Sequence, residues 1–413
     1  MPPSPPPPLT PDRELPTLMV AAALALAAAV SLGLARFSYA LLLPPMRADL
    51  GWSYTTAGAM NTVNAAGYLL GALLAPSWLR RFGARNTLLA GGIGSALLLV
   101  AHGAVDSDAA LYLLRGLTGI ASAATFVSGG LLAARLSGRA PIDGARPAPS
   151  AGLVLGIYYG GTGVGIVISA LLVPPLSVLP GAHPWGWAWV ALGLAALIAT
   201  AITAAATRGL EPARAAPSAS ERFEWRHFAC GLASYFLFGL GYIGYMTFVV
   251  TLLREQQLGS VAITVFYALL GVAVLGSSFV WAGLLQRQRG GGAMRLLNAL
   301  LAVATVLPVL SAHPVAVFAS GILFGGVFLS VVASTTALVR HNLPAGAWPA
   351  GIAAFTIVFA AGQIVGPTLV GWVADGTGGL RGGLAVSAGV LLLGALLAWG
   401  QKPLDQPLDA ARA

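Results

Sequence analysis

The chain has 413 residues, of which 57% are hydrophobic and only 8% are charged, and its mean hydropathy is +0.82. Soluble proteins carry about 25% charged residues, so this composition excludes a soluble globular enzyme. The net charge of +9 does not indicate a nucleic-acid-binding protein, because no long polar stretch remains for such a domain. A single cysteine, Cys230, excludes disulfides within the chain and thiolate metal sites. We expect an all-α polytopic membrane protein that is not an enzyme and that needs no cofactor or metal.

Apolar runs of about 20 residues, the length that crosses a bilayer as a helix, follow one another along the chain. They predict twelve transmembrane helices at 17–45, 53–78, 86–104, 109–134, 151–174, 186–206, 227–252, 260–285, 294–311, 314–339, 347–373 and 380–399. The longest polar interruption lies midway. We therefore expect a Pro-rich N-terminal tail (1–16), a six-helix half (17–206), a linker (207–226), a second six-helix half (227–400) and a C-terminal tail (401–413).

The basic residues indicate the orientation of these helices. Most of the 22 Lys and Arg residues fall on the side of the predicted helices that also holds both termini and the linker. The loops on the opposite side contain only Arg47, Arg254 and Arg381. Cytoplasmic loops of membrane proteins are enriched in Lys and Arg, so both termini are expected in the cytoplasm. We expect a multi-pass protein of a bacterial inner membrane.

The two halves resemble each other at a constant offset. Gly33, Leu34, Ala35 and Tyr39 fall on Gly239, Leu240, Gly241 and Tyr245, and the glycines of the fifth helix fall on those of the eleventh. The basic turn that begins at Arg81 falls on the turn that begins at Arg287. A parallel repeat of this kind places a substrate site between the halves, near the middle of the bilayer.

Five local patterns resemble the major facilitator superfamily, over essentially the whole chain. They are LRRFGAR at 79–85, with Arg80 where the family has aspartate; RGLTG at 115–119; GIYYGG at 156–161, with glycine in place of proline; GQIVGP at 362–367; and GLARFSY at 33–39. The last resembles the YbfB/YjiJ-like group. The resemblance implies a fold of two pseudosymmetric six-helix halves and a cavity lined by the first, fourth, seventh and tenth helices. Gating and helix packing are then assigned to Arg81, Gly83, Arg85, Gly119, Gly156, Gly160, Gly362, Gly366 and Pro367.

Two arginines, Arg36 and Arg115, lie deep within predicted helices, and no acidic residue is expected at their depth. An arginine in the middle of a membrane helix costs about 2.5–3.5 kcal/mol, which implies a polar cavity or partners. The guanidiniums could bind an anion such as a carboxylate or phosphate. Alternatively, each could hold neighbouring helices together through backbone carbonyls and hydroxyls.

Further polar and aromatic residues are candidates for the cavity, and some of them lie at positions that match between the two halves. We expect Tyr39 to face the same way as Arg36, one helical turn away. Tyr39, Tyr242 and Tyr245 could line the cavity or pack between helices. The amide side chains of Asn61, Asn64 and Gln363 could contact a ligand or form interhelical hydrogen bonds. Three tryptophans at the start of the sixth helix, Trp185, Trp187 and Trp189, predict an aromatic belt at the membrane interface. The full set of candidate substrate-binding residues is Arg36, Tyr39, Asn61, Asn64, Arg115, Tyr242, Tyr245 and Gln363.

These features predict a secondary transporter that moves a small organic solute, most simply an anion, by alternating access. The alternative is a broad exporter of hydrophobic or cationic compounds by proton antiport, as the partial antiporter pattern in the fifth helix suggests. The expected partners are a small-molecule substrate and the lipid bilayer, and no nucleic acid. No carboxylate or histidine is expected deep in a helix, so Asp49 and Glu255 at the outer rim are the candidates for proton coupling.

Overall fold

The computed structural model describes residues 16–136, 150–210 and 223–404, and these ranges contain helices and no strand. The first half consists of α1 (Thr17–Ala28), η1 (Ala29–Phe37), α2 (Tyr39–Leu50), α3 (Tyr54–Phe82), α4 (Ala84–His102), α5 (Asp108–Leu136), α6 (Ala151–Leu176) and α7 (Trp185–Ala206). The second half consists of η2 (Trp225–Phe228), α8 (Ala229–Glu255), α9 (Ser260–Val280), α10 (Ala282–Arg287), α11 (Gly292–Leu310), α12 (Pro314–Asn342), η3 (Ala345–Ala347), α13 (Trp348–Ala374) and α14 (Gly379–Trp399).

Each predicted span has a counterpart in the structure, in which α1, η1 and α2 form one continuous crossing and α9 continues into α10. Eleven helical runs in the described ranges are long and apolar enough to cross a membrane. The remaining helix, α3, has 29 residues, which is also sufficient length, but Asn61 and Asn64 lower its hydropathy. The predicted boundaries are wrong by several residues in places. The first crossing, for example, continues through Pro44 and Pro45 to Leu50.

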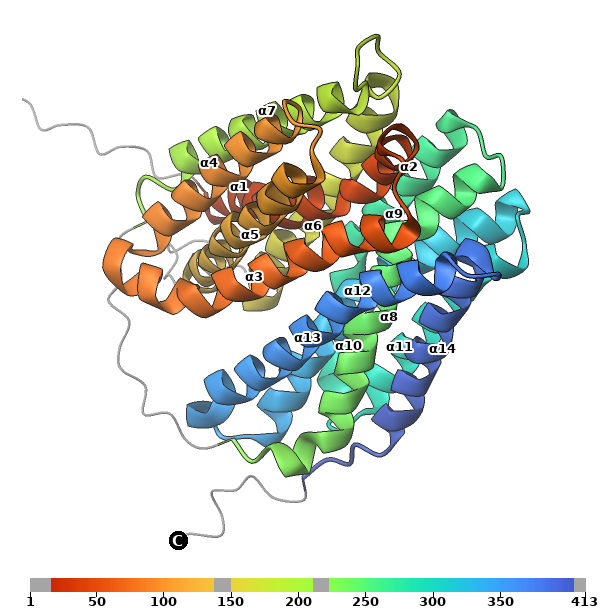
Figure 1. Cartoon of the computed structure of the whole chain (residues 1–413). Coiled ribbons are helices and arrows are strands. Elements are labelled where there is room, and N and C mark those ends of the chain that lie inside the picture. Colours follow the sequence, from red (N-terminus) through yellow and green to blue (C-terminus); the bar gives the residue numbers. More distant parts are fainter. Residues whose placement is uncertain (1–15, 137–149, 211–222, 405–413) are drawn as a thin grey trace, which may run out of the picture.

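The helices form two bundles, and Figure 1 shows α1–α7 in the upper part of the view and most of α8–α14 below them and to their right. Within the first bundle, α3 and α4 pack on α5, and within the second, α8 and α11 pack on α14. The bundles meet chiefly through two pairs of helices, α3 with α13 and α6 with α9. The pseudosymmetric twelve-helix architecture expected from the sequence is therefore confirmed.

Glycines allow the close approach of the two bundles. A Cβ atom on Gly58 of α3 would lie 2.2 Å from the Pro367 carbonyl oxygen of α13, and one on Gly163 of α6 would lie 2.3 Å from the Gly271 carbonyl oxygen of α9. We call the end of the bundle where α1 begins and α14 finishes the terminal end, and the opposite end the distal end. The contact of Gly371 with the Tyr54 backbone continues this close packing to the distal end.

Candidate functional site

A cavity of about 680 Å³ lies between the two bundles. It reaches from Ser150 and Arg340, near the terminal end of α6 and α12, to Arg36 and Gln363. Among the described residues that line it there is no aspartate or glutamate. Aromatic rings from both halves form part of the wall: Phe37, Tyr68, Phe126, Tyr159, Phe238, Tyr242, Phe279, Phe328 and Phe359.

Arg36 forms the inner end of this cavity. Its side chain is 3% exposed, and Nη2 donates a hydrogen bond of 2.8 Å to Oε1 of Gln363, on α13 of the other half. The guanidinium lies over the ring of Tyr68, 5.5 Å from its centroid. A guanidinium has five N–H donors, and the Nε of Arg36 is buried with no hydrogen-bond partner in the described part of the chain. Arg36 is therefore a buried cation whose hydrogen-bonding capacity is mostly unused.

Gln363 links Arg36 to a tyrosine of the second half. Its Nε2 donates to the hydroxyl of Tyr242 on α8, while its Oε1 accepts from Arg36. Three of the predicted substrate-binding residues, Arg36, Tyr242 and Gln363, are thus joined in one chain of hydrogen bonds. All three line the cavity.

The local backbone explains why Arg36 points into the cavity. Residues Ala29–Phe37 form a π-helix, in which the N–H of Ser38 bonds to the carbonyl of Gly33. Such wide turns are rare in proteins overall, and those that occur are often found at functional sites. The extra residue in the turn changes the helical register, so the prediction that Arg36 and Tyr39 face the same way is wrong. The matching helix of the second half, α8, is a regular α-helix.

Arg115 lies deep in the first half and does not line the cavity. Its side chain is 1% exposed, Nη1 donates to the carbonyl of Ala35 and Nη2 to Oδ1 of Asn61, both at 3.1 Å. Its guanidinium lies 4.6 Å from the ring centroid of Tyr39. Nδ2 of Asn61 donates in turn to the hydroxyl of Thr247 on α8, at 2.7 Å. Arg115 therefore joins three helical segments of its own half and, through Asn61, contacts the other half.

The other candidate residues also lie outside the cavity lining. The Tyr39 hydroxyl donates to the carbonyl of Ala57, Asn64 donates to the carbonyl of Arg115, and the Tyr245 hydroxyl lies 2.6 Å from that of Ser320. For Tyr39, Asn61, Asn64, Arg115 and Tyr245, these contacts favour the alternative interpretation, in which polar side chains hold helices together.

The stacking of aromatic rings along the second-half wall of the cavity was not predicted from the sequence. The rings of Phe238, Tyr242 and Phe359 lie within 20° of parallel, with centroids 4.8–5.6 Å apart. Offset stacking of this kind is a favourable arrangement for aromatic pairs. The signal was present in α8, where Tyr235, Phe238, Tyr242 and Tyr245 recur every three or four residues, which places them along one side of a helix.

The distal end is closed by contacts between the halves. Asp375, which follows α13, accepts hydrogen bonds from the N–H groups of Tyr54 and Thr55 at the start of α3 and from the Thr55 hydroxyl. The Tyr54 hydroxyl donates to Glu255, and the Arg47 guanidinium lies over the Tyr54 ring. Partial burial alone would raise the pKa of Asp375, but the hydrogen bonds from Thr55 and Tyr54 lower it below its ordinary value. The carboxylate is therefore ionised at neutral pH and caps α3 from the other half.

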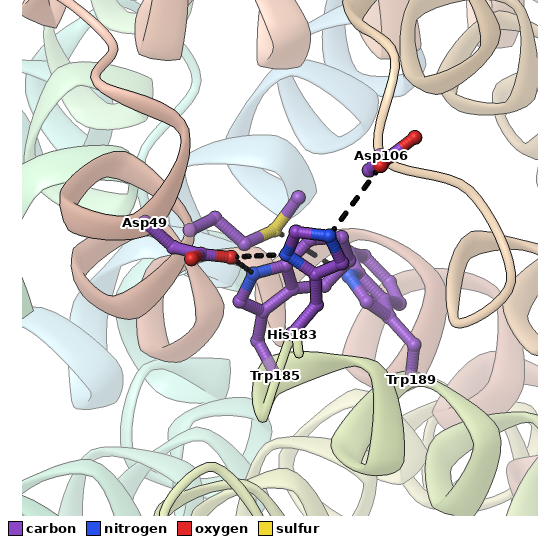
Figure 2. A network of polar contacts seen from close by, with 6 residues as sticks. Asp49, Asp106, His183, Trp185 and Trp189 are labelled. Atoms are coloured by element: carbon purple, nitrogen blue, oxygen red, sulfur yellow. Dashed lines mark hydrogen bonds and ion pairs between the residues drawn. The ribbon is translucent and has the colours of Figure 1, made fainter. Parts of the chain in front are cut away.

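A second polar network ties together the distal loops of the first half (Figure 2). His183 lies between two carboxylates, with Nδ1 at 2.6 Å from Asp49 and Nε2 at 3.4 Å from Asp106. Nε1 of Trp185 donates to the same oxygen of Asp49. The hydrogen bond with Asp49, together with the charge of Asp106, raises the pKa of His183 above its ordinary value.

The three tryptophans predicted as an interfacial belt differ in position. Trp187 is 53% exposed, as a membrane-facing residue would be, but Trp185 and Trp189 are buried within the protein. Trp189 stacks on His102, with ring centroids 4.4 Å apart. The belt prediction is therefore wrong for Trp185 and Trp189, because their indoles fill the interior of the first half.

The residues assigned to gating and packing lie at helix contacts and turns. Gly83 ends α3 at φ +79°, and a Cβ on Gly119 would lie 2.2 Å from the Asn64 carbonyl oxygen. Gly156 and Gly160 face α9 of the other half, whereas Gly362 and Gly366 pack against α8 of their own half. Pro367 contributes its carbonyl to the contact with Gly58. Arg81 lies over the Phe82 ring, and Arg85 donates to the carbonyl of Ala204.

Comparisons with known proteins agree with this architecture. The family described as "Uncharacterised MFS-type transporter YbfB" matches residues 28–399. No curated protein matches the chain at a significant level.

Among solved structures, a bacterial homologue of the human lysosomal transporter Spinster, inward-facing and unoccupied, is 16% identical, with a TM-score of 0.70 over 93% of this chain and 96% of that one. The nucleoside transporter NupG is 13% identical, with a TM-score of 0.68 over 93% of this chain and 98% of that one. At these identities, the likeness establishes the fold.

Proposed function

Because the chain belongs to the YbfB-type family of major facilitator superfamily transporters, we propose that it moves a small organic anion across the membrane by alternating access. The observation that carries this proposal is the buried Arg36 guanidinium at the inner end of an aromatic cavity that has no carboxylate among its described lining residues. An anion would supply the missing counter-charge. Arginine offers a planar pair of donors that suits a carboxylate or phosphate.

The rest of the cavity favours an organic anion over a small inorganic one. Its volume of about 680 Å³ lies within the range of about 300–1,000 Å³ that holds small organic ligands. The ring faces and edges of Tyr68, Tyr242 and Phe359 would contact apolar parts of such a molecule. Arg340, at the mouth of the cavity, adds a second positive charge along the entry path.

The contacts between the two halves suggest how a substrate in the central cavity would change the conformation. The cavity is open toward the terminal end and closed toward the distal end by the contacts of Asp375 and of the interbundle glycines. The hydrogen bond from Arg36 to Gln363 crosses between the halves, so an anion that takes the Arg36 donors competes with a contact that helps to hold this state. With both termini in the cytoplasm of a bacterial cell, as the distribution of basic residues favours, this state would be open to the inside of the inner membrane.

The first experiment is a thermal-shift screen of the purified protein in detergent against organic anions and cations. A ligand that binds the native state raises the melting temperature by mass action. We expect stabilisation by one class of organic anion, with at least a tenfold loss of affinity in Arg36→Gln. Arg340→Gln is the matched control, because it removes the same charge from the mouth of the same cavity, and we expect it to keep most of the affinity.

Transport into proteoliposomes then separates transport from binding alone. An anion that stabilises the wild type but not Arg36→Gln should accumulate only with the wild-type protein. Stabilisation by lipophilic cations, unchanged in Arg36→Gln, would overturn the anion proposal and favour the exporter of hydrophobic or cationic compounds. In that case, the aromatic wall would be the binding surface and Arg36 would have a structural role.

A further inference from the structure

A second cavity, of about 210 Å³, lies at the terminal end of the first half and shares no lining residue with the central cavity. It is formed by the start of α4, the end of α5 and the residues that follow α7. Three arginines line it, Arg85, Arg135 and Arg208, together with the apolar side chains of Phe82 and Leu210. Three segments that lie far apart in the sequence thus bring three positive charges to one pocket.

These arginines have no acidic partner in the described part of the chain. The ion pairs of that part involve other residues, and Arg85 donates only to the carbonyl of Ala204, with a buried Nε that has no partner. The pocket also contains the first residues of α4, a helix of 19 residues whose start carries no side-chain cap among the described residues. The partial positive charge of that helix end adds to the field of the guanidiniums. A pocket with this chemistry would bind a phosphate group.

The surroundings of the pocket indicate the source of the phosphate. The pocket lies where α4 begins and α7 ends, which is the level of the membrane surface for helices that cross the bilayer. Farther along the same helices, apolar side chains of α4 and α7 face outward, among them Ile93 at 45% exposed and Ile202 at 50% exposed. Phe82, at the rim, is 52% exposed. Acyl chains could lie along this surface while a headgroup occupies the pocket.

We propose that the pocket formed by Arg85, Arg135 and Arg208 binds the phosphate of an anionic phospholipid. Basic pockets between transmembrane helices at the cytoplasmic level can bind such headgroups. The apolar surface of α4 and α7 favours a phospholipid over free phosphate as the source. The proposal is independent of the substrate of the central cavity.

Native mass spectrometry of the full-length protein in detergent tests this proposal. Cardiolipin, phosphatidylglycerol and phosphatidylcholine would be added at equal concentrations, and bound lipid would be counted for each. We expect at least a tenfold preference for the anionic lipids in the wild type. Arg135→Gln/Arg208→Gln should reduce that preference about tenfold, and Arg135→Lys/Arg208→Lys should restore part of it because the charges return. Both positions are at least partly exposed, so the substitutions leave no buried hole.

The repeat provides a matched control in the second half. Arg287→Gln/Arg289→Gln removes two exposed charges from the equivalent basic turn at the same end of the molecule, and we expect the lipid preference to remain. An equal loss in both double variants would show a general effect of charge and overturn the proposal. Binding of inorganic phosphate at millimolar concentration, without preference among the lipids, would overturn the phospholipid as the source. Absence of any anionic preference in the wild type would overturn the site itself.

Discussion

Asp375 contributes to the closure of the distal end, and removal of its charge should weaken that closure. Asp375 accepts hydrogen bonds from the N–H groups of Tyr54 and Thr55 at 2.8 and 2.9 Å and from the Thr55 hydroxyl at 2.6 Å. Hydrogen bonds to a charged group contribute about 1.5–3 kcal/mol each, and less where water competes, as at this exposed site. In Asp375→Asn, a neutral amide oxygen keeps part of these bonds. We therefore expect the closed end to lose about 1–2 kcal/mol, which is about a 5- to 30-fold shift toward the open state.

Distances between spin labels across the distal end measure this shift. Cys230 is the only cysteine, so a Cys230→Ser background allows labels at Ser107→Cys and Ala312→Cys. These positions lie in the distal loops that precede α5 and α12, one in each half. We expect Asp375→Asn to increase the population of long distances in the absence of substrate.

The matched control removes a carboxylate from the same end without affecting a contact between the halves. Asp108 accepts a hydrogen bond of 2.7 Å from Nε1 of Trp52, and both residues belong to the first half. Asp108→Asn should leave the distance distribution unchanged. The reasoning is refuted if Asp375→Asn behaves as the wild type does, or if Asp108→Asn opens the distal end as much as Asp375→Asn.

Two further predictions concern buried and exposed charges of the first half. Arg115→Met should lower the melting temperature by several degrees but preserve ligand affinity, because it leaves two buried acceptors unpaired at about 1–3 kcal/mol each; a loss of affinity comparable to that of Arg36→Gln would contradict the packing interpretation. The raised pKa of His183 means that its ion pair with Asp49 stabilises the protein fully below about pH 6.5 and less as the pH rises through the raised value. The melting temperature of the wild type should therefore fall over that interval relative to His183→Gln, and parallel pH profiles of the two proteins would refute this assignment.

The order of the helices followed from hydropathy alone, because each crossing requires about 20 apolar residues whatever its neighbours are. The contacts of Arg36 did not follow in the same way. Its partner Gln363 is 327 residues away in the sequence, and no periodicity connects positions in different halves. The π-helix around Arg36 is a further tertiary effect. Nothing in the pattern from Gly33 to Tyr39 distinguishes a wide turn from a regular one, and the same residues therefore predicted the wrong neighbour for Tyr39.

Burial was the other quantity that the sequence predicted only in part. Trp185, Trp187 and Trp189 have the composition and position of a membrane belt, yet two of the three pack inside the protein. An apolar helix face can contact lipid or another helix with equal ease, since both surroundings are apolar. Polar residues were more informative, because a buried arginine needs either hydrogen-bond partners or a cavity. Arg115 has such partners in neighbouring helices, and Arg36 lines the cavity.

In the proposed mechanism, the unpaired charge of Arg36 would make the empty carrier sensitive to voltage. A bound organic anion would cancel this charge, so a membrane potential would act mainly on the unloaded protein, at about 2.3 kcal/mol for each elementary charge that crosses 100 mV. With the terminal end in the cytoplasm and a negative interior, the field would hold the empty protein open to the cytoplasm. The electrical current would then accompany the return of the empty carrier rather than the passage of the substrate, and the resting potential would act together with the substrate's concentration gradient on the direction of net transport.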